Sequence, residues 1–195
     1  MKNIIKISSK LFKKNISDHK KLLVTHNSII LKKAIELSKL SINSINNGGK
    51  IIIFGNGGSA ADAQHFATEL VVKMKYYRKA LPVLALTTDT STLTAIGNDF
   101  NFSKIFSRQL EALGNKSDLV ISITTSGNSE NILEALKFAK KKNIKSFGIL
   151  GNNGGNAKKY CFDKFVVKNS NPSRIQEIHI IFWQLVCEII EEYYL

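Results

Sequence analysis

The sequence predicts an α/β protein, built as a three-layer α/β/α sandwich with a five-stranded parallel sheet and a long N-terminal helix. Two observations lead to this prediction. Five short apolar runs alternate with helical patterns of about 10 to 20 residues, and connections of that length join parallel strands by right-handed crossovers. The runs also end in loops of small polar residues, which is typical of the carboxyl edge of a doubly wound sheet. We expect one domain, with a helical extension over about residues 1–47 and an α/β core over about residues 50–195.

The first predicted element is a long helix from Asp18 to about Asn46. Its apolar residues recur at helical intervals, and an Asn-Asn-Gly-Gly run at residues 46–49 ends the pattern. The apolar positions are Leu23, Ile30, Ala34, Leu37, Leu40 and Ile45.

Five predicted strands and a final helix complete the fold. The strands are residues 50–54, 82–86, 118–123, 145–150 and 164–167. The final helix, which contains Ile175 to Ile190, is apolar on nearly every face. A helix of this kind is buried, and we expect it to pack against another subunit as well as against its own sheet.

The composition favours a soluble, globular protein of the cytoplasm. The chain has 195 residues, of which 44% are hydrophobic, and a domain of this size buries roughly 70% of its unfolded surface. No run approaches the ~18 uninterrupted apolar residues of a membrane span. The two cysteines, Cys161 and Cys187, lack CxxC spacing, and no apolar signal segment opens the chain. These features indicate a reducing compartment and no membrane anchor.

The net charge of +13 raises the question of a nucleic-acid partner. The first 50 residues hold 11 Lys and 2 acidic residues, yet only 3 of the 28 basic residues in the chain are Arg. Arg is the residue that phosphate and base recognition favours. We therefore interpret most of the charge as a solvated lysine surface and do not expect nucleic-acid binding. A surface that attracts anionic substrates remains an alternative.

The loop after the first strand can bind an anion. The run Gly55-Asn56-Gly57-Gly58-Ser59-Ala60 precedes a predicted helix, whose N-terminal amides and dipole favour a negative charge. It also fits the dinucleotide pattern G-x-G-x-x-A. That pattern requires an acidic residue about 20 positions later, and there is none between Glu69 and Asp89. The sequence therefore disfavours a dinucleotide site.

The loop after the third strand is a stronger phosphate candidate. Four hydroxyl side chains stand together there, at Thr124, Thr125, Ser126 and Ser129. Free N–H groups at a strand-to-helix turn bind anions. Ordinary helix capping by Ser129 or the preceding Asn is the alternative, but it accounts for one hydroxyl only. The loop predicts a small phosphorylated ligand.

Two further groups of residues are candidates for acid–base or metal chemistry. His65 and Glu69 are four residues apart on the predicted second helix and share a face. A solvated ion pair is the alternative interpretation. Gln176, Glu177 and His179 are polar residues at the start of the apolar final helix, and polar groups that enter a buried helix need partners.

Four ordered blocks of the sequence resemble the phosphoheptose isomerases, which are members of the sugar isomerase (SIS) domain superfamily. The blocks are GNGGSAADAQHFATEL, LTTDTSTLTAIGNDF, FSRQLEALGNKSDLVISITTSGNSENILEAL and SRIQEIHI. The resemblance implies the flavodoxin-like SIS fold, and it implies conversion of D-sedoheptulose 7-phosphate to D-glycero-D-manno-heptose 7-phosphate for the heptose of bacterial surface polysaccharide. It also implies a cytoplasmic homotetramer with sites between subunits and one zinc ion per subunit.

The resemblance assigns roles to individual positions. Glu69 matches the catalytic base and also a substrate and zinc position, Gln176 matches a substrate and zinc position, and His65 matches a zinc ligand. Thr124 is the exception in residue type, because the family usually has Ser there. The other matching substrate positions are Asn56, Gly57, Gly58, Ser59, Asn98, Asp99, Thr125, Ser126 and Ser129.

The chain departs from the family pattern at Gln184. The family has a histidine at this position, eight residues after Gln176, which acts as a zinc ligand and second acid/base. An amide cannot transfer a proton near neutral pH, although its oxygen can still bind a metal. His179 cannot replace it, because the two residues point about 140° apart on a helix. We expect weaker zinc binding and slower turnover, and a non-catalytic phosphosugar-binding or regulatory SIS protein is the alternative function.

Overall fold

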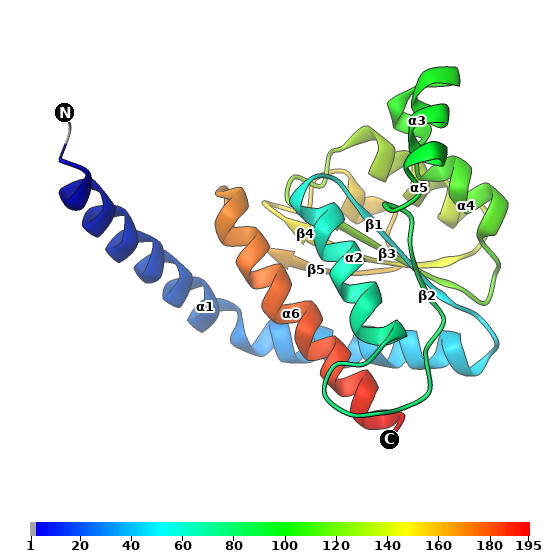
Figure 1. Ribbon diagram of the computed structural model, residues 1–195, viewed down its shortest axis with the longest axis horizontal. Coiled ribbons are helices and arrows are strands. Elements are labelled where there is room, and N and C mark those ends of the chain that lie inside the picture. Colours follow the sequence, from blue (N-terminus) through cyan, green and yellow to red (C-terminus); the bar gives the residue numbers. More distant parts are fainter. Residues whose placement is uncertain (1–2) are drawn as a thin grey trace.

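The computed structural model describes residues 3–195 and contains the predicted parallel sheet between two helical layers (Figure 1). The five strands are arranged in the order β2-β1-β3-β4-β5, and every neighbouring pair is parallel. Chain order reverses between β1 and β3, which is where ligands bind on such sheets. The strands are β1 (Ile51–Gly55), β2 (Val83–Ala85), β3 (Leu119–Thr124), β4 (Lys145–Gly151) and β5 (Asp163–Val167).

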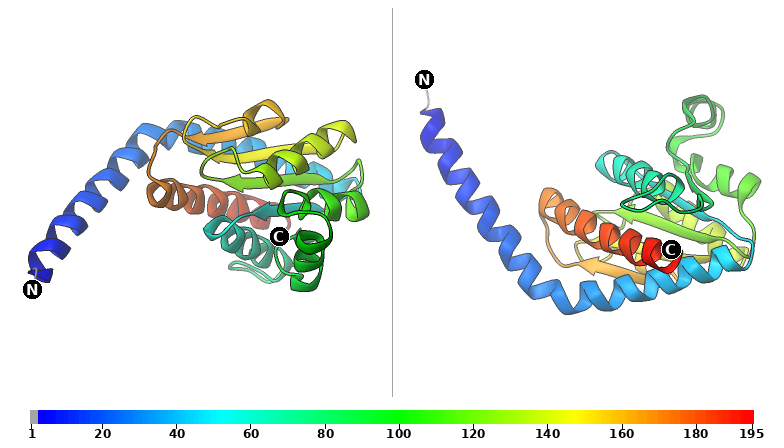
Figure 2. Two further views of the ribbon diagram at one scale, coloured as in Figure 1. Left: turned by 90° about the horizontal axis from the view of Figure 1, so that it is seen from above. Right: turned by 60° about the horizontal axis from the view of Figure 1, so that its bottom comes forward.

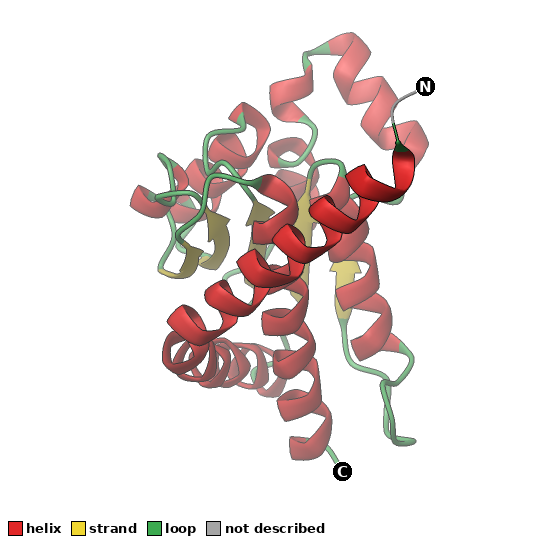
Figure 3. Ribbon diagram, turned by 90° about the vertical axis from the view of Figure 1, so that its left-hand side faces the viewer, coloured by secondary structure: helices red, strands yellow, loops and turns green. Residues whose placement is uncertain are grey.

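The helices divide between the two faces of the sheet, and Figure 3 shows the strands between them. One face is covered by α1 (Ile4–Asn46), α2 (Gly58–Val71) and α6 (Pro172–Tyr193). The other is covered by α3 (Thr90–Asp99), α4 (Ser107–Leu113) and α5 (Glu130–Lys141), with short helices at Phe102–Lys104 and Ala157–Lys159. The predicted three-layer α/β sandwich is confirmed.

Strand β1 explains why both faces are covered. Its side chains alternate, so that Ile51 and Ile53 enter the core under α2 and α6 while Ile52 and Phe54 enter the core under α5. All four are fully buried. Strands that are apolar on both faces need helices on both sides, and the continuous apolar runs of the sequence therefore determine the sandwich.

Helix α1 begins earlier than predicted. The sequence pattern placed its start at Asp18, whereas the helix begins at Ile4, where the Asn3 side chain accepts a hydrogen bond from the Lys6 backbone N–H at 3.1 Å. Its first part projects away from the sheet (Figure 2). Apolar side chains of this part, such as that of Phe12, are exposed. The remainder of the helix packs along α6. The predicted end at Asn46 is confirmed.

Within one chain, the outer face of α6 is only half-buried, and the expected packing of this face against another subunit stays a prediction. The inner face contributes Phe182, Trp183 and Val186 to the core. Ile181, Leu185 and Ile189 are partly covered. Among the described residues, no helix is long and apolar enough to span a membrane.

Candidate active site

The loops that follow β1 and β3 are joined at the carboxyl edge of the sheet, where the sequence predicts the site. Asn56 follows β1 and Asn131 lies in the first turn of α5. Their amides form a reciprocal pair: Asn56 Nδ2 donates to Asn131 Oδ1 at 2.9 Å, and Asn131 Nδ2 donates to Asn56 Oδ1 at 2.8 Å. This pair holds the first predicted substrate loop against the helix that follows the hydroxyl-rich loop.

Two glycines shape the first loop. Gly57 has a φ of +55°, a conformation that is strained for residues with a side chain. At Gly58, a Cβ atom would lie 2.6 Å from Nε2 of Gln176. The absence of a side chain thus lets Gln176 of α6 approach the substrate loop, and Ser59, in the next position, is buried.

The hydroxyl-rich loop uses two of its four hydroxyls to shape its own turn. Thr124 Oγ1 accepts a hydrogen bond from the Gly127 backbone N–H at 3.2 Å, and Ser126 Oγ accepts one from the Asn128 backbone N–H at 3.1 Å. Ser129 occupies the N-cap position of α5, but within the described chain its side chain makes no capping hydrogen bond. Capping therefore does not account for the Ser129 hydroxyl, which remains available to a ligand at the N-terminus of α5.

His65 and Glu69 are paired on α2, as their spacing predicts. Nε2 of His65 lies 2.9 Å from Oε1 of Glu69. The side chain of His65 is 53% exposed and that of Glu69 is 19% exposed, so a substrate can reach the imidazole while the carboxylate is partly shielded from water. The His65 ring also contacts the edge of the Trp183 ring, with centroids 4.9 Å apart. The pair therefore lies at the contact between α2 and α6.

Asp62 is a residue of this region that the sequence analysis missed. It lies one turn before His65 and is buried, and within residues 3–195 its Oδ2 has no hydrogen-bond partner. Burial raises the pKa of its carboxyl to about 6, although the charge of His65 and the Trp183 indole act in the opposite direction. The sequence offered one signal for Asp62, because an acidic residue three positions before His65 lies on the same side of the helix as this candidate metal ligand.

The four positions that match zinc ligands are brought together only in part. His65 and Glu69 converge, but Gln176 contacts Gly58, which lies seven residues before His65 on α2, about 10 Å along the helix axis. Gln184 is half-buried beside Trp183. Among residues 3–195, no group of three or more His, Cys, Asp and Glu side chains is arranged to hold a metal ion. One chain thus offers two converging donors, one imidazole nitrogen and one carboxylate.

Two further predicted substrate positions lie outside the loops after β1 and β3. Asn98 and Asp99 end α3 and are exposed, and Asn98 Nδ2 donates to Asp99 Oδ1 at 2.9 Å. In the described chain, no hydrogen bond connects them to the loops after β1 and β3. Their role in substrate binding stays a prediction.

His179 is buried beneath the site and cannot act as a surface acid or base. Within the described residues, both of its ring nitrogens lack a side-chain hydrogen-bond partner. Burial lowers the pKa of the imidazole to about 4. The prediction that His179 does not stand in for Gln184 agrees with this position.

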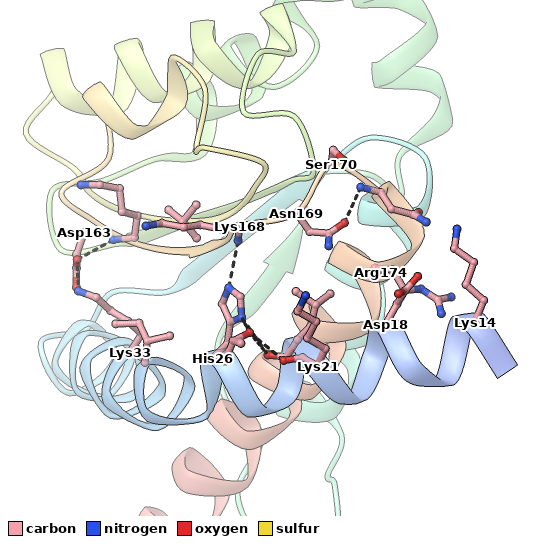
Figure 4. A pocket seen from close by; sticks show the side chains of 16 residues that line it. Lys14, Asp18, Lys21, His26, Lys33, Asp163, Lys168, Asn169, Ser170 and Arg174 are labelled. Atoms are coloured by element: carbon pink, nitrogen blue, oxygen red, sulfur yellow. Dashed lines mark hydrogen bonds and ion pairs between the residues drawn. The ribbon is translucent and has the colours of Figure 1, made fainter. Parts of the chain in front are cut away.

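A large cavity of about 1040 Å³ lies elsewhere, between α1 and the β5–α6 connection (Figure 4). Lys21 and Lys168 are among its basic lining residues. Lys33 also lines it, and its Nζ lies 2.7 Å from Oδ1 of Asp163. None of the predicted site residues lines it. The lysine-rich first 50 residues thus contribute a basic groove that is separate from the candidate active site.

The comparisons with known proteins identify the family of the chain. The family model described as "SIS domain" matches residues 12–151. The chain is 49% identical over 182 residues to phosphoheptose isomerase 1 of Campylobacter jejuni, covering 93% of this chain and 97% of that protein. It is 51% identical over 154 residues to the phosphoheptose isomerase of Aliarcobacter butzleri, covering 79% of this chain and 82% of that protein.

A solved structure gives the same result. The phosphoheptose isomerase of Neisseria gonorrhoeae is 36% identical and superimposes with a TM-score of 0.85, covering 97% of this chain and 100% of that one. Both the fold and the sequence are thus shared over almost the whole chain. The chain therefore belongs to the SIS domain family and, within it, to the phosphoheptose isomerases.

Proposed function

We propose that this protein is an aldose–ketose isomerase, an intramolecular oxidoreductase that converts D-sedoheptulose 7-phosphate to D-glycero-D-manno-heptose 7-phosphate. The observation that carries this proposal is the His65–Glu69 pair on α2, in which Nε2 of His65 lies 2.9 Å from Oε1 of Glu69. The relatives named phosphoheptose isomerase support the substrate. The product would serve the synthesis of heptose for bacterial surface polysaccharide.

The proposed reaction moves protons between neighbouring atoms of the sugar. The Glu69 carboxylate takes the proton from C1 of the ketose, the C1–H electron pair forms the C1=C2 bond, and the O2 oxygen takes a proton from water to give an enediol. Glu69 then delivers its proton to C2 while the hydroxide left by that water takes the O1 proton, so that the aldehyde forms at C1 and the water is restored. General acid–base transfer of this kind typically contributes ~10²- to 10⁴-fold in rate.

The loop before α5 is proposed to hold the 7-phosphate. Phosphate oxygens would accept hydrogen bonds from the Ser129 hydroxyl and from the backbone N–H groups at the start of α5, where the helix dipole also favours an anion. Holding the phosphate fixes the distance of C1 and C2 from Glu69. This orientation effect is a large part of catalysis in a single-substrate reaction.

The proposal includes weak zinc binding at His65 and Glu69. A bound divalent ion would polarise the substrate carbonyl. Imidazole nitrogen and carboxylate oxygen are both accepted zinc donors, whereas the amides of Gln176 and Gln184 are weaker ones. The donor set therefore supports a lower zinc affinity than that of a relative with histidine at position 184.

We also propose that the active form is a homotetramer in the cytoplasm, without a nucleic-acid partner. The half-buried face of α6 borders a groove of about 440 Å³ against α1, lined by Ile35, Ile42, Ile189 and other residues. Monomers rarely leave long apolar faces exposed. Static light scattering of the purified protein tests the tetramer.

A non-catalytic phosphosugar-binding protein is the second candidate, and Gln184 is the observation that favours it. The test is turnover of sedoheptulose 7-phosphate, with and without zinc, by the wild type and by Gln184→His. Turnover by the wild type supports the isomerase. Binding of the sugar phosphate without turnover by either form would replace the isomerase with the binding protein.

A further inference from the structure

Helices α2 and α6 carry every candidate catalytic and metal-binding position and run side by side in the same direction (Figure 1). Residues at corresponding positions of the two helices contact each other, from the start of both helices onward. Gly58 meets Gln176 near the start of each, and further along, Phe66 stacks on Trp183 with ring centroids 5.6 Å apart. The spacing of the two helices therefore determines where Glu69 stands relative to α6.

The segment 72–82 connects α2 to β2 and brings a buried arginine back to the end of α2. The Arg78 guanidinium donates through Nη2 to the Glu69 carbonyl oxygen and through Nη1 to the Leu70 carbonyl oxygen, both at 2.8 Å. Its side chain is only 1% exposed. The last carbonyls of a helix have no partner within the helix, so Arg78 fixes the turn of α2 that carries Glu69.

Glu191 on α6 holds the same segment from the other side. Its carboxylate accepts hydrogen bonds from the backbone N–H groups of Met74 at 2.8 Å, Lys75 at 2.7 Å and Tyr76 at 3.3 Å. Burial by itself would raise the pKa of this carboxyl, but these bonds and Arg78 hold the pKa below its usual range. Nε of Arg78 lies 3.6 Å from Oε1 of Glu191, so that the two charges are paired in the interior.

We propose that Arg78 and Glu191 are positioning residues, which form a buried clamp between the ends of α2 and α6 and thereby place the Glu69 carboxylate for proton transfer. This inference rests on the proposed role of Glu69 as base. A buried ion pair is often no more stabilising than apolar residues of the same size. Stability alone therefore does not explain the clamp, whereas fixing the turn that carries Glu69 does.

The chain contains a matched control for the clamp. Asp118 is also a buried carboxylate, with 1% of its side chain exposed, paired with Lys50 Nζ at 2.7 Å. It accepts hydrogen bonds from the backbone N–H groups of Lys50 and Asn115. It precedes β3, and its hydrogen bonds in the described chain join the segments before β1 and β3 and reach neither α2 nor α6. Asp118→Asn therefore perturbs a similar buried network without touching α2 or α6.

The first measurement compares kcat and KM of Glu191→Gln, Arg78→Met and Asp118→Asn with the wild type at saturating zinc. A displacement of about 1 Å can cost ~10²-fold in rate. We expect kcat to fall at least about 10-fold in the two clamp variants with KM within about 2-fold, and to change little in Asp118→Asn, which loses stability only. Arg78→Lys should recover part of the lost kcat because it keeps the charge.

The second measurement uses Trp183, the only tryptophan of the chain, as a reporter of the α2–α6 contact. Its emission maximum should move to longer wavelength in the clamp variants and stay unchanged in Asp118→Asn. This readout needs no turnover, so it tests the clamp even if the wild type proves inactive and the proposed function fails.

Two results would overturn the clamp. One is wild-type kcat and wild-type Trp183 emission in folded clamp variants; the other is an equal loss of kcat in Asp118→Asn. If the single variants do not fold, the double variant Arg78→Met, Glu191→Leu removes both charges together. A folded double variant with wild-type kcat would likewise overturn the proposal, and one with a reduced kcat would support it.

Discussion

Replacement of Asp62 by Asn should stabilise the protein at neutral pH and do so much less in mild acid. Asp62 is 8% exposed, and burial raises the pKa of its carboxyl from 3.8 to about 6. The folded state therefore binds the proton more tightly than the unfolded state does. Stability is lost as the pH rises from about 4 to about 6, because folding then requires a charged carboxylate in an apolar setting.

The magnitude follows from the shift. A difference of about 2 pKa units corresponds to about 3 kcal/mol in the free energy of unfolding above pH 7. At pH 4.5 the same linkage relation leaves a penalty of about 1 kcal/mol. Asn carries no charge, so Asp62→Asn should gain up to about 3 kcal/mol at pH 7.5 and about 1 kcal/mol at pH 4.5.

Urea unfolding at the two pH values checks this expectation, with the exposed Asp99→Asn as a control that should change stability by less than about 0.5 kcal/mol at either pH. The reasoning is refuted if Asp62→Asn gives the same change in free energy at both pH values or destabilises the protein at pH 7.5. Either result would mean that the carboxylate of Asp62 is stabilised by the fold.

Four further expectations concern the site and the assembly. Glu69→Gln should lower kcat by ~10²- to 10⁴-fold while calorimetry still detects binding of the sugar phosphate. Ser129→Ala should weaken that binding without lowering the melting temperature, because the hydroxyl makes no capping hydrogen bond in the described chain; a lost cap would instead show as lower stability. Gln184→His should tighten zinc in a calorimetric titration, and unchanged affinity would contradict its place near the metal. Leu185→Glu on the half-buried face of α6 should reduce the mass in light scattering, and an intact assembly would place the interface elsewhere.

The sheet could be predicted from sequence because each strand is short and mostly apolar. All five predicted strands occur within two residues of their expected limits, since buried parallel strands leave a continuous apolar signal. The start of α1 was missed because residues 4–17 pack on little else in the chain. Their apolar side chains are largely exposed. These residues therefore lack the regular apolar pattern by which a helix that packs on a core is recognised in sequence.

The site could be predicted where its chemistry is local. His65 and Glu69 are one helical turn apart, and the hydroxyls after β3 lie within six residues. Arg78 and Glu191 were missed because the contact joins distant parts of the chain, and neither residue belongs to a short motif. The position of Gln176 beside Gly58 depends on the packing of α6 against α2, which no pattern in one segment specifies.

The contact of α1 with α6 places the earliest and the latest helices in one core. During synthesis on the ribosome, the apolar face of α1 therefore stays uncovered until the whole sheet and then α6 have emerged and α6 can pack on it. Contacts between such distant segments slow folding, and uncovered apolar surface promotes aggregation. Nascent chains that stall before α6 should accordingly depend on chaperones more than the finished chain does.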